Sequence, residues 1–301
     1  MALLPPDASG PRAFRTLPFS TQNIRLLITW KRPMKAENPM YIRPDAVSSS
    51  ISAEEWQTRV DLAACYRLHA HYGWTDLIYT HISARVPGAE EHFLLNPFRL
   101  MFDEITASNL VKIDLDGNVV SPTPHPIHRA GFVIHSAIHG GRPDAQCVIH
   151  AHTRAGMAVS AMECGLLPLT QHAMLFHGKI GYHDSEGLAN QLGERERLVR
   201  DIGDKPVMIL RNHGTLVAGK TIGQAFAMMW HLEMAMQAQV DALASGQKLT
   251  YGSPELATRI ASNSFREPGQ PRADGSISPL GHMEWPALLR RMDRLDPSFR
   301  Q

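Results

Sequence analysis

Two histidines, His150 and His152, stand two residues apart at the end of the apolar run 147–152. Such a run predicts a short buried strand, and because strand side chains alternate, both imidazoles then lie on the same face. A third histidine, His213, follows another apolar run in a tight Asn-His-Gly turn, where it can approach the end of a neighbouring strand. Three neutral imidazoles with one open coordination position are typical of a catalytic divalent-metal site. Each histidine taken alone is more often an ordinary hydrogen-bonded residue.

Alternating helix and strand patterns frame these histidines. A capping box at Ser52 and Glu55 begins a helix, and a second box at Thr221 and Gln224 begins a long one. The intermingled patterns predict one α/β domain whose first strands pair antiparallel through short turns. The expected strands cover residues 76–86, 92–96, 110–115, 119–120, 146–152 and 206–211, and the expected helices cover residues 52–72, 130–139 and 221–244.

The two ends of the chain differ from this body, which is expected at residues 52–250. Residues 1–51 are rich in proline and lack a sustained apolar period, which predicts a flexible leader. Residues 251–301 begin with a stretch rich in Gly, Pro and Ser, which predicts a linker. They continue into a short helix with Trp285 and Met292 on its apolar face. That helix is expected to dock on the body or on a neighbouring subunit.

Composition excludes several classes of function. The 301 residues carry 30 basic and 29 acidic side chains, a net charge of +1, so no extended positive field exists for nucleic acid. No run of about 18 uncharged apolar residues predicts a membrane span. Cys65, Cys147 and Cys164 lie in apolar runs without CxxC spacing and are expected to be buried free thiols. Because no secretory pattern is present either, a cytoplasmic location is expected.

Several ordered segments together match a known pattern. They are His150-Ala-His152 with residues 142–145 before it, Arg211-Asn-His-Gly214, His81-Ile-Ser-Ala-Arg85, and residues 93–97, 104–108, 158–162, 164–168 and 182–184. Over about residues 53–245 the chain resembles the class II aldolase/adducin family. The resemblance implies a three-layer α/β/α fold around a mostly antiparallel central sheet and a tetrameric habit. It also implies zinc or a similar divalent ion, held by three histidines that correspond to His150, His152 and His213.

The resemblance breaks at two places that matter for chemistry. Sugar-phosphate aldolases carry an acid–base glutamate four residues before a helical histidine, and Gly131 stands at the corresponding position here. Those aldolases bind the substrate phosphate with small polar groups, where this chain has His81 and Phe98. In these places the sequence is most similar to the adducin head domain, a cytoskeletal module without known aldolase activity.

Other histidines and two arginines are candidates for the remaining roles. His172 falls near the position of an aldolase tyrosine that protonates the product from the adjacent subunit, and an imidazole can carry protons near neutral pH. His128 lies just before Gly131 and can reach the cavity. We therefore expect His172 and His128 to be catalytic, and Arg85 and Arg99 to bind a substrate carboxylate. Packing or solvation is the competing interpretation of all four side chains.

The resemblance thus implies a metal-dependent lyase acting on a small oxygenated carbonyl compound or acid, through aldol cleavage, decarboxylation or related enolate chemistry. Zinc is the first choice of cofactor, with manganese and iron(II) as alternatives that the same ligands accept. The expected partners are a small-molecule substrate and further copies of the chain in a homo-oligomer. Two alternatives stay open: a non-catalytic adducin-like interaction module with a structural or vestigial metal site, and a non-haem iron oxygenase on the same fold.

Overall fold

A computed structural model describes residues 51–88, 91–187, 192–265 and 280–301. The chain divides into two units, Met1–Asn38 and Pro39–Gln301, and all the described residues belong to the second unit. The leader expected at residues 1–51 therefore lies almost entirely outside the described residues.

A seven-stranded sheet forms the centre of the second unit, in the order β3-β2-β1-β4-β7-β6-β5. Each neighbouring pair of described strands runs antiparallel except β5 and β6, which are parallel. The expected α/β class with a mostly antiparallel sheet is therefore confirmed. The strands are β1 (His81–Arg85), β2 (Phe93–Leu95), β3 (Val111–Ile113), β4 (Cys147–Ala151), β5 (Ile180–His183), β6 (Val207–Leu210) and β7 (Gly214–Gly219).

Side-chain caps fix where the helices begin. Ser52 Oγ accepts a hydrogen bond from the backbone N–H of Glu55 (3.1 Å), and Thr221 Oγ1 accepts one from that of Gln224 (3.0 Å), as the sequence predicts. The Glu55 carboxylate does not complete its capping box, because it pairs with Arg59 and Lys112 instead. The helices are α2 (Ala53–His71), α3 (Arg129–Gly141), α4 (Arg154–Ser160), α5 (Gln171–Met174), α6 (Arg195–Ile202), α7 (Ile222–Ala244), α8 (Pro254–Ser264) and α9 (Glu284–Leu295), with 3-10 turns at Phe102–Glu104, Leu192–Glu194 and Pro297–Arg300.

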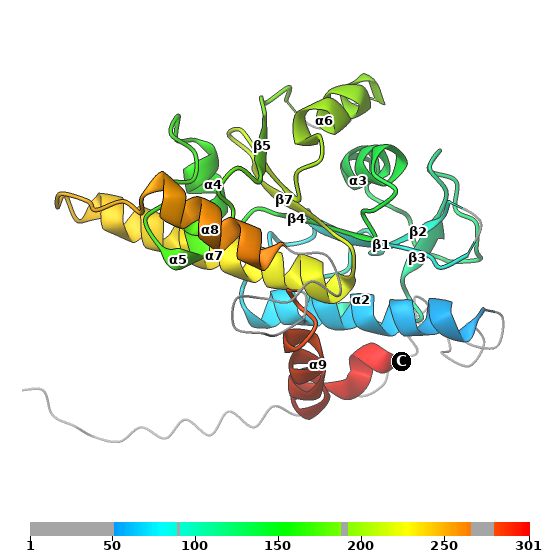
Figure 1. Ribbon diagram of the computed structural model, residues 1–301. Coiled ribbons are helices and arrows are strands. Elements are labelled where there is room, and N and C mark those ends of the chain that lie inside the picture. Colours follow the sequence, from blue (N-terminus) through cyan, green and yellow to red (C-terminus); the bar gives the residue numbers. More distant parts are fainter. Residues whose placement is uncertain (1–50, 89–90, 188–191, 266–279) are drawn as a thin grey trace, which may run out of the picture. The chain divides into compact units, whose positions relative to one another are not determined.

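Helices cover both faces of the sheet and so give three layers (Figure 1). The two longest, α2 and α7, lie on one face, whereas α3 and α6 lie on the other. Strand alternation supplies both layers with apolar side chains. In β4, Ile149 packs in the apolar cluster on the α2 and α7 side, and its neighbour Val148 packs in the cluster on the α3 and α6 side. The strand that carries His150 is therefore held from both faces.

The first strand is shorter than expected. β1 begins only at His81, because residues 76–79 form a turn in which the backbone N–H of Tyr79 donates to the carbonyl of Asp76 (2.9 Å). Leu77 has a left-handed backbone (φ 48°), and its side chain is exposed. The β-branched and aromatic residues of this segment predict a strand but carry no signal for such a turn. As a result, Asp76 lies in a turn before β1 and not within the strand.

The stretch expected to be a linker contains a further helix, α8. Ser253 caps it and Pro254 occupies its first turn, a combination that marks a helix start. The expectation of a linker rested on the overall composition of the stretch, which does not reveal this local helix start. The helix expected at the C-terminal side is present as α9, which buries Met292 and contacts α2 and α7.

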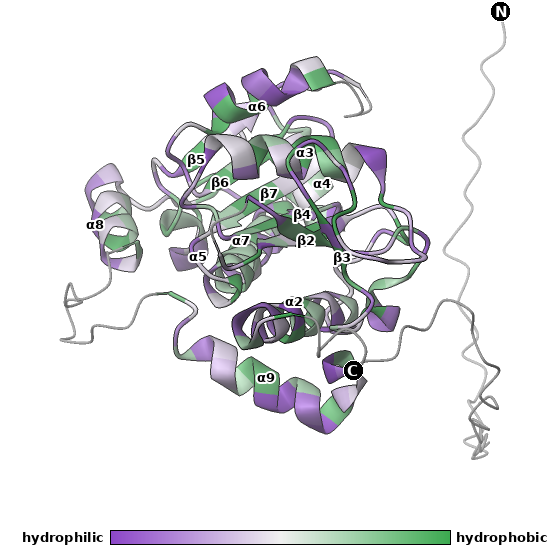
Figure 2. Ribbon diagram, turned by 90° about the vertical axis from the view of Figure 1, so that its right-hand side faces the viewer, coloured by the Kyte–Doolittle hydropathy of each residue, from purple (hydrophilic) through white to green (hydrophobic). Residues whose placement is uncertain are grey.

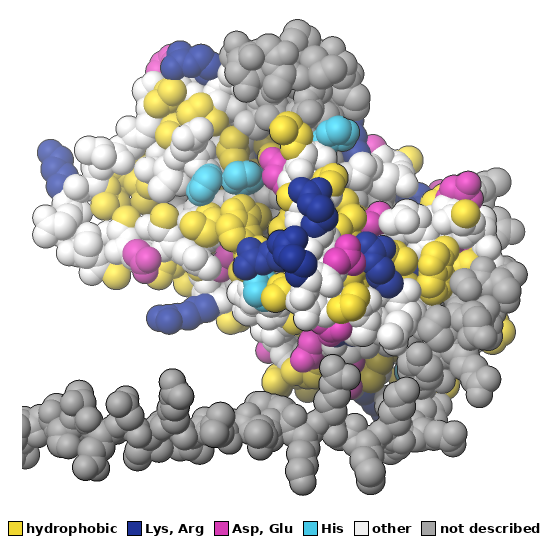
Figure 3. All heavy atoms as spheres, turned by 90° about the horizontal axis from the view of Figure 1, so that it is seen from below, with side chains coloured by type: hydrophobic (Ala, Val, Ile, Leu, Met, Phe, Trp, Pro, Cys, Tyr) yellow, Lys and Arg dark blue, Asp and Glu magenta, His cyan; other side chains and the backbone are white. Residues whose placement is uncertain are grey.

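The surface reflects the balanced charge of the chain. None of the described helices is both long and apolar enough to cross a membrane. The strands are mainly hydrophobic, whereas α6 and α9 mix hydrophilic with hydrophobic residues along their length (Figure 2). Seen from below, Lys and Arg side chains gather near the middle of the face with acidic side chains among them (Figure 3). Cys164 is exposed, contrary to the expectation of a buried thiol, because it lies in the turn region after α4, while Cys65 and Cys147 are buried.

Candidate metal centre

The pairing of β4 with β7 brings the three predicted ligands together. In the antiparallel register His150 faces Leu216 and Ala151 faces Thr215, so the end of β4 lies beside the start of β7. His213 immediately precedes β7, in a turn whose Asn212 has a left-handed backbone (φ 57°), a conformation that asparagine tolerates. One ligand nitrogen from each of His150, His152 and His213 lies within 4.8 Å of the others.

Hydrogen bonds fix which nitrogen of two of these rings carries the proton. His150 Nδ1 lies 3.0 Å from the carbonyl oxygen of Thr215, and His152 Nδ1 lies 2.9 Å from the carboxylate of Asp76. Both partners can only accept, so each Nδ1 is the donor, and each neutral ring presents an unprotonated Nε2. The two Nε2 atoms face one another at 2.9 Å. Two lone pairs at that distance repel each other unless a cation or a proton lies between them.

Burial keeps the rings of His150 and His213 neutral. It lowers the pKa of His150 well below its usual range and that of His213 to about 4, and the neighbouring histidines add to both effects. Neutral imidazoles are the form that binds metal ions. Ligand nitrogens about 2.0–2.1 Å from a tetrahedral zinc ion lie about 3.4 Å from each other. The Nε2 atoms of His150 and His152 are 2.9 Å apart, and the ligand atoms of all three histidines lie within 4.8 Å of one another. The nitrogen–nitrogen distance that zinc requires lies between these two values, so the three histidines fit a divalent ion.

His81 lies directly beside this centre. It is the β-ladder partner of His150, and the two rings stack with centroids 5.4 Å apart and planes 25° apart. The His81 side chain is buried, and neither ring nitrogen has a hydrogen-bond partner. Among the described residues, Thr80 Oγ1 and His135 Nε2 are also buried and unpartnered. Unpaired buried polar atoms are rare in folded proteins and indicate an unseen partner.

Gly131 and His81, the two departures from the aldolase pattern, are in contact. A Cβ atom at position 131 would lie 2.5 Å from Cδ2 and 3.0 Å from Nε2 of His81. His128, which caps α3 just before this glycine, stacks on the other side of His81 with centroids 5.7 Å apart. His128 therefore lies one ring further from the metal centre than His81 does, and Phe98 packs against it.

The two arginines expected to bind substrate lie at different ends of the sheet. Arg85 is at the far end of β1 from His81, where its guanidinium donates to the carbonyl of His139 and lies 3.7 Å from the carboxylate of Glu91. Within one chain Arg85 therefore lies at the opposite edge of the sheet from the histidines, and its role in binding a substrate stays a prediction. Arg99 is exposed, follows β2 at the edge where the histidines lie, and has a left-handed backbone (φ 81°). It stays a candidate.

His172 is apart from the metal centre in a single chain. On α5 its Nδ1 lies 3.2 Å from Nδ1 of His231 on α7, and the centroids of the two rings are 4.9 Å apart. The expectation for His172 concerns a neighbouring subunit, so it stays a prediction.

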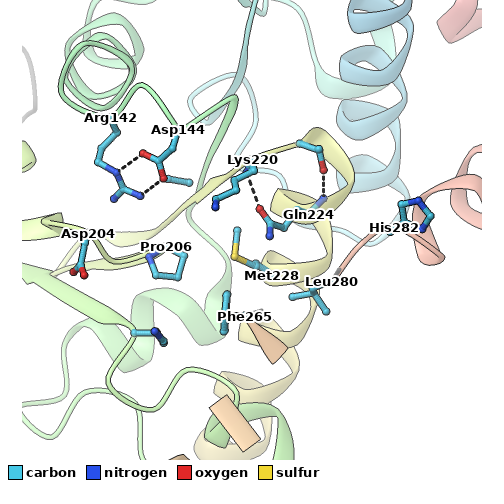
Figure 4. Close-up of a pocket in the computed structure, with 13 residues that line it drawn as sticks. Arg142, Asp144, Asp204, Pro206, Lys220, Gln224, Met228, Phe265, Leu280 and His282 are labelled. Atoms are coloured by element: carbon cyan, nitrogen blue, oxygen red, sulfur yellow. Dashed lines mark hydrogen bonds and ion pairs between the residues drawn. The ribbon is translucent and has the colours of Figure 1, made fainter. Parts of the chain in front are cut away.

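One hollowed part of the surface is remote from the histidines. A cavity of about 330 Å³ is lined by Arg142, Asp144, Lys220 and Gln224, among others (Figure 4). Asp144 precedes β4 and Lys220 follows β7, whereas His152 follows β4 and His213 precedes β7. The cavity and the metal centre therefore lie at opposite edges of the sheet. Its charged groups are partly paired with each other, as Arg142 and Asp144 are at 2.8 Å.

The residues that orient the ligands were not predicted from the sequence. Asp76 is a single carboxylate in a segment that was expected to be a strand, and Thr215 contributes only its backbone carbonyl. No pattern in the sequence marks a backbone acceptor. For Asp76 the weak signal is its place three residues after Gly73, where a turn can begin.

Comparison with known proteins is consistent with this geometry. The family model described as class II aldolase and adducin N-terminal domain matches residues 60–240. The chain belongs to this family. It is 47% identical over 254 residues to a Caulobacter vibrioides protein provisionally named a class 2 aldolase, covering 84% of this chain and 96% of that protein. It is 42% identical over 248 residues to alpha-adducin of Rattus norvegicus, covering 79% of this chain but only 33% of the adducin.

Two solved structures of the family have the same fold. An aldolase II superfamily protein from Pseudomonas syringae is 48% identical, with a TM-score of 0.78, covering 85% of this chain and 99% of that one. The L-fuculose 1-phosphate aldolase from Glaciozyma antarctica PI12 is 26% identical, with a TM-score of 0.71, covering 88% of this chain and 97% of that one. The family thus contains both a sugar-phosphate aldolase and the adducins.

Proposed function

We propose that the protein is a metal-dependent lyase for a small oxygenated carbonyl compound or acid, with His150, His152 and His213 as the metal ligands. The observation that carries the proposal is the pair of Nε2 atoms at 2.9 Å, each on a ring whose Nδ1 is held by an acceptor. A bound divalent ion supplies Lewis acidity toward a substrate oxygen. Zinc is the first choice, and manganese and iron(II) suit the same ligands.

The surrounding residues prepare the three rings for that role. The Asp76 carboxylate and the Thr215 carbonyl hold the Nδ1 protons of His152 and His150 and so orient both rings, as partners of metal-binding histidines usually do. His150 is buried, whereas His152 and His213 are half-buried. A small substrate can therefore approach from the side of the two half-buried rings.

The family supports a lyase, but not the complete mechanism of its sugar-phosphate members. The likeness to a fuculose-phosphate aldolase favours cleavage or formation of a bond next to a carbonyl group. Gly131 offers no carboxylate, so the usual acid–base group of these aldolases has no counterpart at that position. We propose aldol cleavage, decarboxylation or a related reaction, since all of them pass through an enolate-like state that a polarised carbonyl stabilises.

Metal content tests the first half of the proposal. We expect plasma mass spectrometry of anaerobically purified protein to find about one zinc, manganese or iron per chain. His150→Ala and His213→Ala should lose it, whereas His177→Ala, which changes an exposed histidine, should keep it. No stoichiometric metal, even after reconstitution, would overturn the proposed enzyme.

Hydrogen–deuterium exchange tests the second half without knowledge of the reaction. The metal-loaded protein should accelerate the loss of α-proton signals of dihydroxyacetone or pyruvate in D₂O, followed by NMR, and His213→Ala should not. Metal binding without exchange in either compound would favour the second candidate function. That candidate is an adducin-like interaction module with a structural metal, supported by the 42% identity to alpha-adducin and by Gly131. Stoichiometric iron with oxygen consumption would instead indicate a non-haem iron oxygenase.

The protein is further proposed to act as a homo-oligomer, a tetramer by family resemblance, in the cytoplasm. Within a single chain His172 pairs with His231 away from the ligands, so a catalytic role for His172 needs a second copy of the chain. Size-exclusion chromatography with light scattering gives the number of copies. A monomer at working concentration would exclude a role of His172 in a neighbouring site.

A further inference from the structure

The space between β1 and α3, beside the proposed metal ligands, contains a group of buried polar atoms without partners. Within the described residues these include both ring nitrogens of His81 and Nε2 of His135. The Cδ2–Nε2 edge of His81 faces α3, since these atoms come within 3.0 Å of a Cβ built at position 131. His135 lies one helical turn beyond Gly131, and its ring stands at 89° to that of His81 with centroids 5.3 Å apart.

A hydrogen-bonded chain fixes the state of His135. The carbonyl of Ala145 can only accept, so His139 Nδ1 donates to it (3.1 Å) and His139 Nε2 is left as an acceptor. Ser83 Oγ therefore donates to His139 Nε2 (2.7 Å), and its oxygen accepts from His135 Nδ1 (2.5 Å). His135 then has an unprotonated Nε2 that faces the His81 side. If one His81 nitrogen donates a hydrogen bond to this atom, the other His81 nitrogen is left for a ligand.

The electrostatic character of this space differs from that of a carboxylate-bearing aldolase site. Gly131 is in the first turn of α3, a helix of 13 residues with no acidic residue in its first turn. The positive end of the helix dipole is therefore not neutralised by an acid of its own turn. Exposed Arg99 lies at the same edge of the sheet. The carboxylate of Asp76, which contacts the ligand set, is engaged with Nδ1 of His152 at 2.9 Å.

We propose that His81 contacts the substrate in the place of the carboxylate that sugar-phosphate aldolases have at the position of Gly131. Ser83, His135 and His139 position the His81 ring. The substrate is consequently a small 2-hydroxy- or 2-oxocarboxylate. A glutamate at position 131 would repel a carboxylate bound beside the metal ion, whereas a neutral imidazole donates a hydrogen bond to it. The substrate class rests on the proposed function, because the carboxylate and its neighbouring oxygen are the groups presented to the metal centre.

Ligand binding to cobalt-loaded protein tests the substrate class. The probes are glycolate, a 2-hydroxycarboxylate, and dihydroxyacetone, a neutral hydroxycarbonyl compound, with inorganic phosphate as competitor. We expect calorimetry to give a dissociation constant for glycolate at least tenfold lower than for dihydroxyacetone, with a change in the visible cobalt spectrum. Equal binding of the two probes would overturn the inference, as would phosphate binding more tightly than glycolate.

A double substitution at positions 81 and 131 tests the role of His81. In His81→Ala/Gly131→Glu the ring is removed and a carboxylate is introduced, so the preference for glycolate should fall at least tenfold while cobalt stoichiometry stays the same. Retention of the preference would overturn the inference. Failure of the wild-type protein to bind cobalt would instead overturn the proposed function, so the two failures are distinguishable.

A pair of serine variants keeps the inference testable if the double variant does not fold. Ser83→Ala removes the hydrogen bond between the Ser83 hydroxyl and His135. Ser136→Ala removes an equally buried hydroxyl that donates to the carbonyl of Val133. Ser83→Ala should weaken glycolate binding by about threefold or more, and Ser136→Ala should not change it. Equal effects of the two substitutions would show that Ser83 has only a packing role.

Discussion

The imidazole of His81 fills the space that a side chain at position 131 would need, since a Cβ there would lie 2.5 Å from Cδ2 of His81. In most helices Gly→Ala stabilises the folded state by about 1 kcal/mol. Gly131→Ala should instead destabilise the protein, because overpacking a buried ring typically costs about 1–3 kcal/mol. Urea denaturation of the metal-free protein measures the change in the free energy of unfolding.

Gly140→Ala is the matched control for this substitution. Gly140 lies in the same helix, but the nearest atoms to its Cβ position are 3.9 Å away. It should therefore show the usual small stabilisation. In a His81→Ala background, Gly131→Ala should become as favourable as Gly140→Ala, because the ring that it meets is gone. A cost for Gly131→Ala that persists without His81 would contradict the contact.

Asp76→Asn should weaken metal binding without removing it. The carboxylate accepts the Nδ1 proton of His152 at 2.9 Å, and outer partners of this kind typically contribute about 10–100-fold to metal affinity. An amide can present its NH₂ group to Nδ1 and so favour the wrong tautomer. Competition of zinc with a chromophoric chelator measures the dissociation constant.

The control for Asp76 is Asp144→Asn, at the opposite edge of the sheet. Asp144 pairs with Arg142 at 2.8 Å and has no contact with the metal centre among the described residues. Its substitution should leave the zinc dissociation constant unchanged. An equal loss of affinity in the two variants would indicate a general effect of lost charge and not an oriented histidine.

His69 should make the stability of the metal-free protein fall in acid. It is buried among Trp74, Phe102 and Phe226, and burial lowers its pKa to about 4. The unfolded chain, with a histidine pKa of about 6.5, then binds more protons between about pH 6.5 and pH 4, so the free energy of unfolding decreases as the pH falls through this window. Between about pH 7.5 and pH 5, this one residue accounts for a loss of about 2 kcal/mol.

His69→Gln removes the titration and keeps a polar side chain of similar size. The variant should lose about 2 kcal/mol less than the wild type between the same two pH values, measured by urea denaturation. Other buried histidines titrate in both proteins, so their contribution cancels in the comparison. The same loss in both proteins would mean that His69 is already protonated in the fold or that it is not buried.

The sequence predicts local geometry well and long-range contacts poorly. The spacing of His150 and His152 is enough to place both on one face, because strand alternation is a local property. The approach of His213 depends on the pairing of β4 with β7, which the spacing of the histidines does not contain. Arg85 was expected to bind a substrate carboxylate, yet along β1 it lies about 13 Å from His81, which is beside the ligands.

The contact between His81 and Gly131 is the clearest example of a long-range contact that the spacing of residues in the sequence cannot predict. Each departure from the aldolase pattern is visible in the sequence, and each was interpreted as the loss of a function. Only the packing of α3 over β1 shows that one departure makes room for the other. Asp76 was missed for a similar reason, since its turn cannot be distinguished from the start of a strand by composition.

The tautomers of the histidine chain give a last prediction. Nitrogen-15 NMR of the metal-free protein should find His139 and His135 both neutral and protonated at Nδ1, because the direction of hydrogen bonding starts at the carbonyl of Ala145. Burial lowers the pKa of His139 to about 3 and that of His135 well below its usual range, so both stay neutral at pH 7. Ser83→Ala should change the His135 signal and leave that of His139 Nδ1 unchanged, and Ser136→Ala should change neither. If His135 is protonated at Nε2 in the wild type, the hydrogen bonds between His135, Ser83 and His139 run in the opposite direction. His135 then has no acceptor that faces His81.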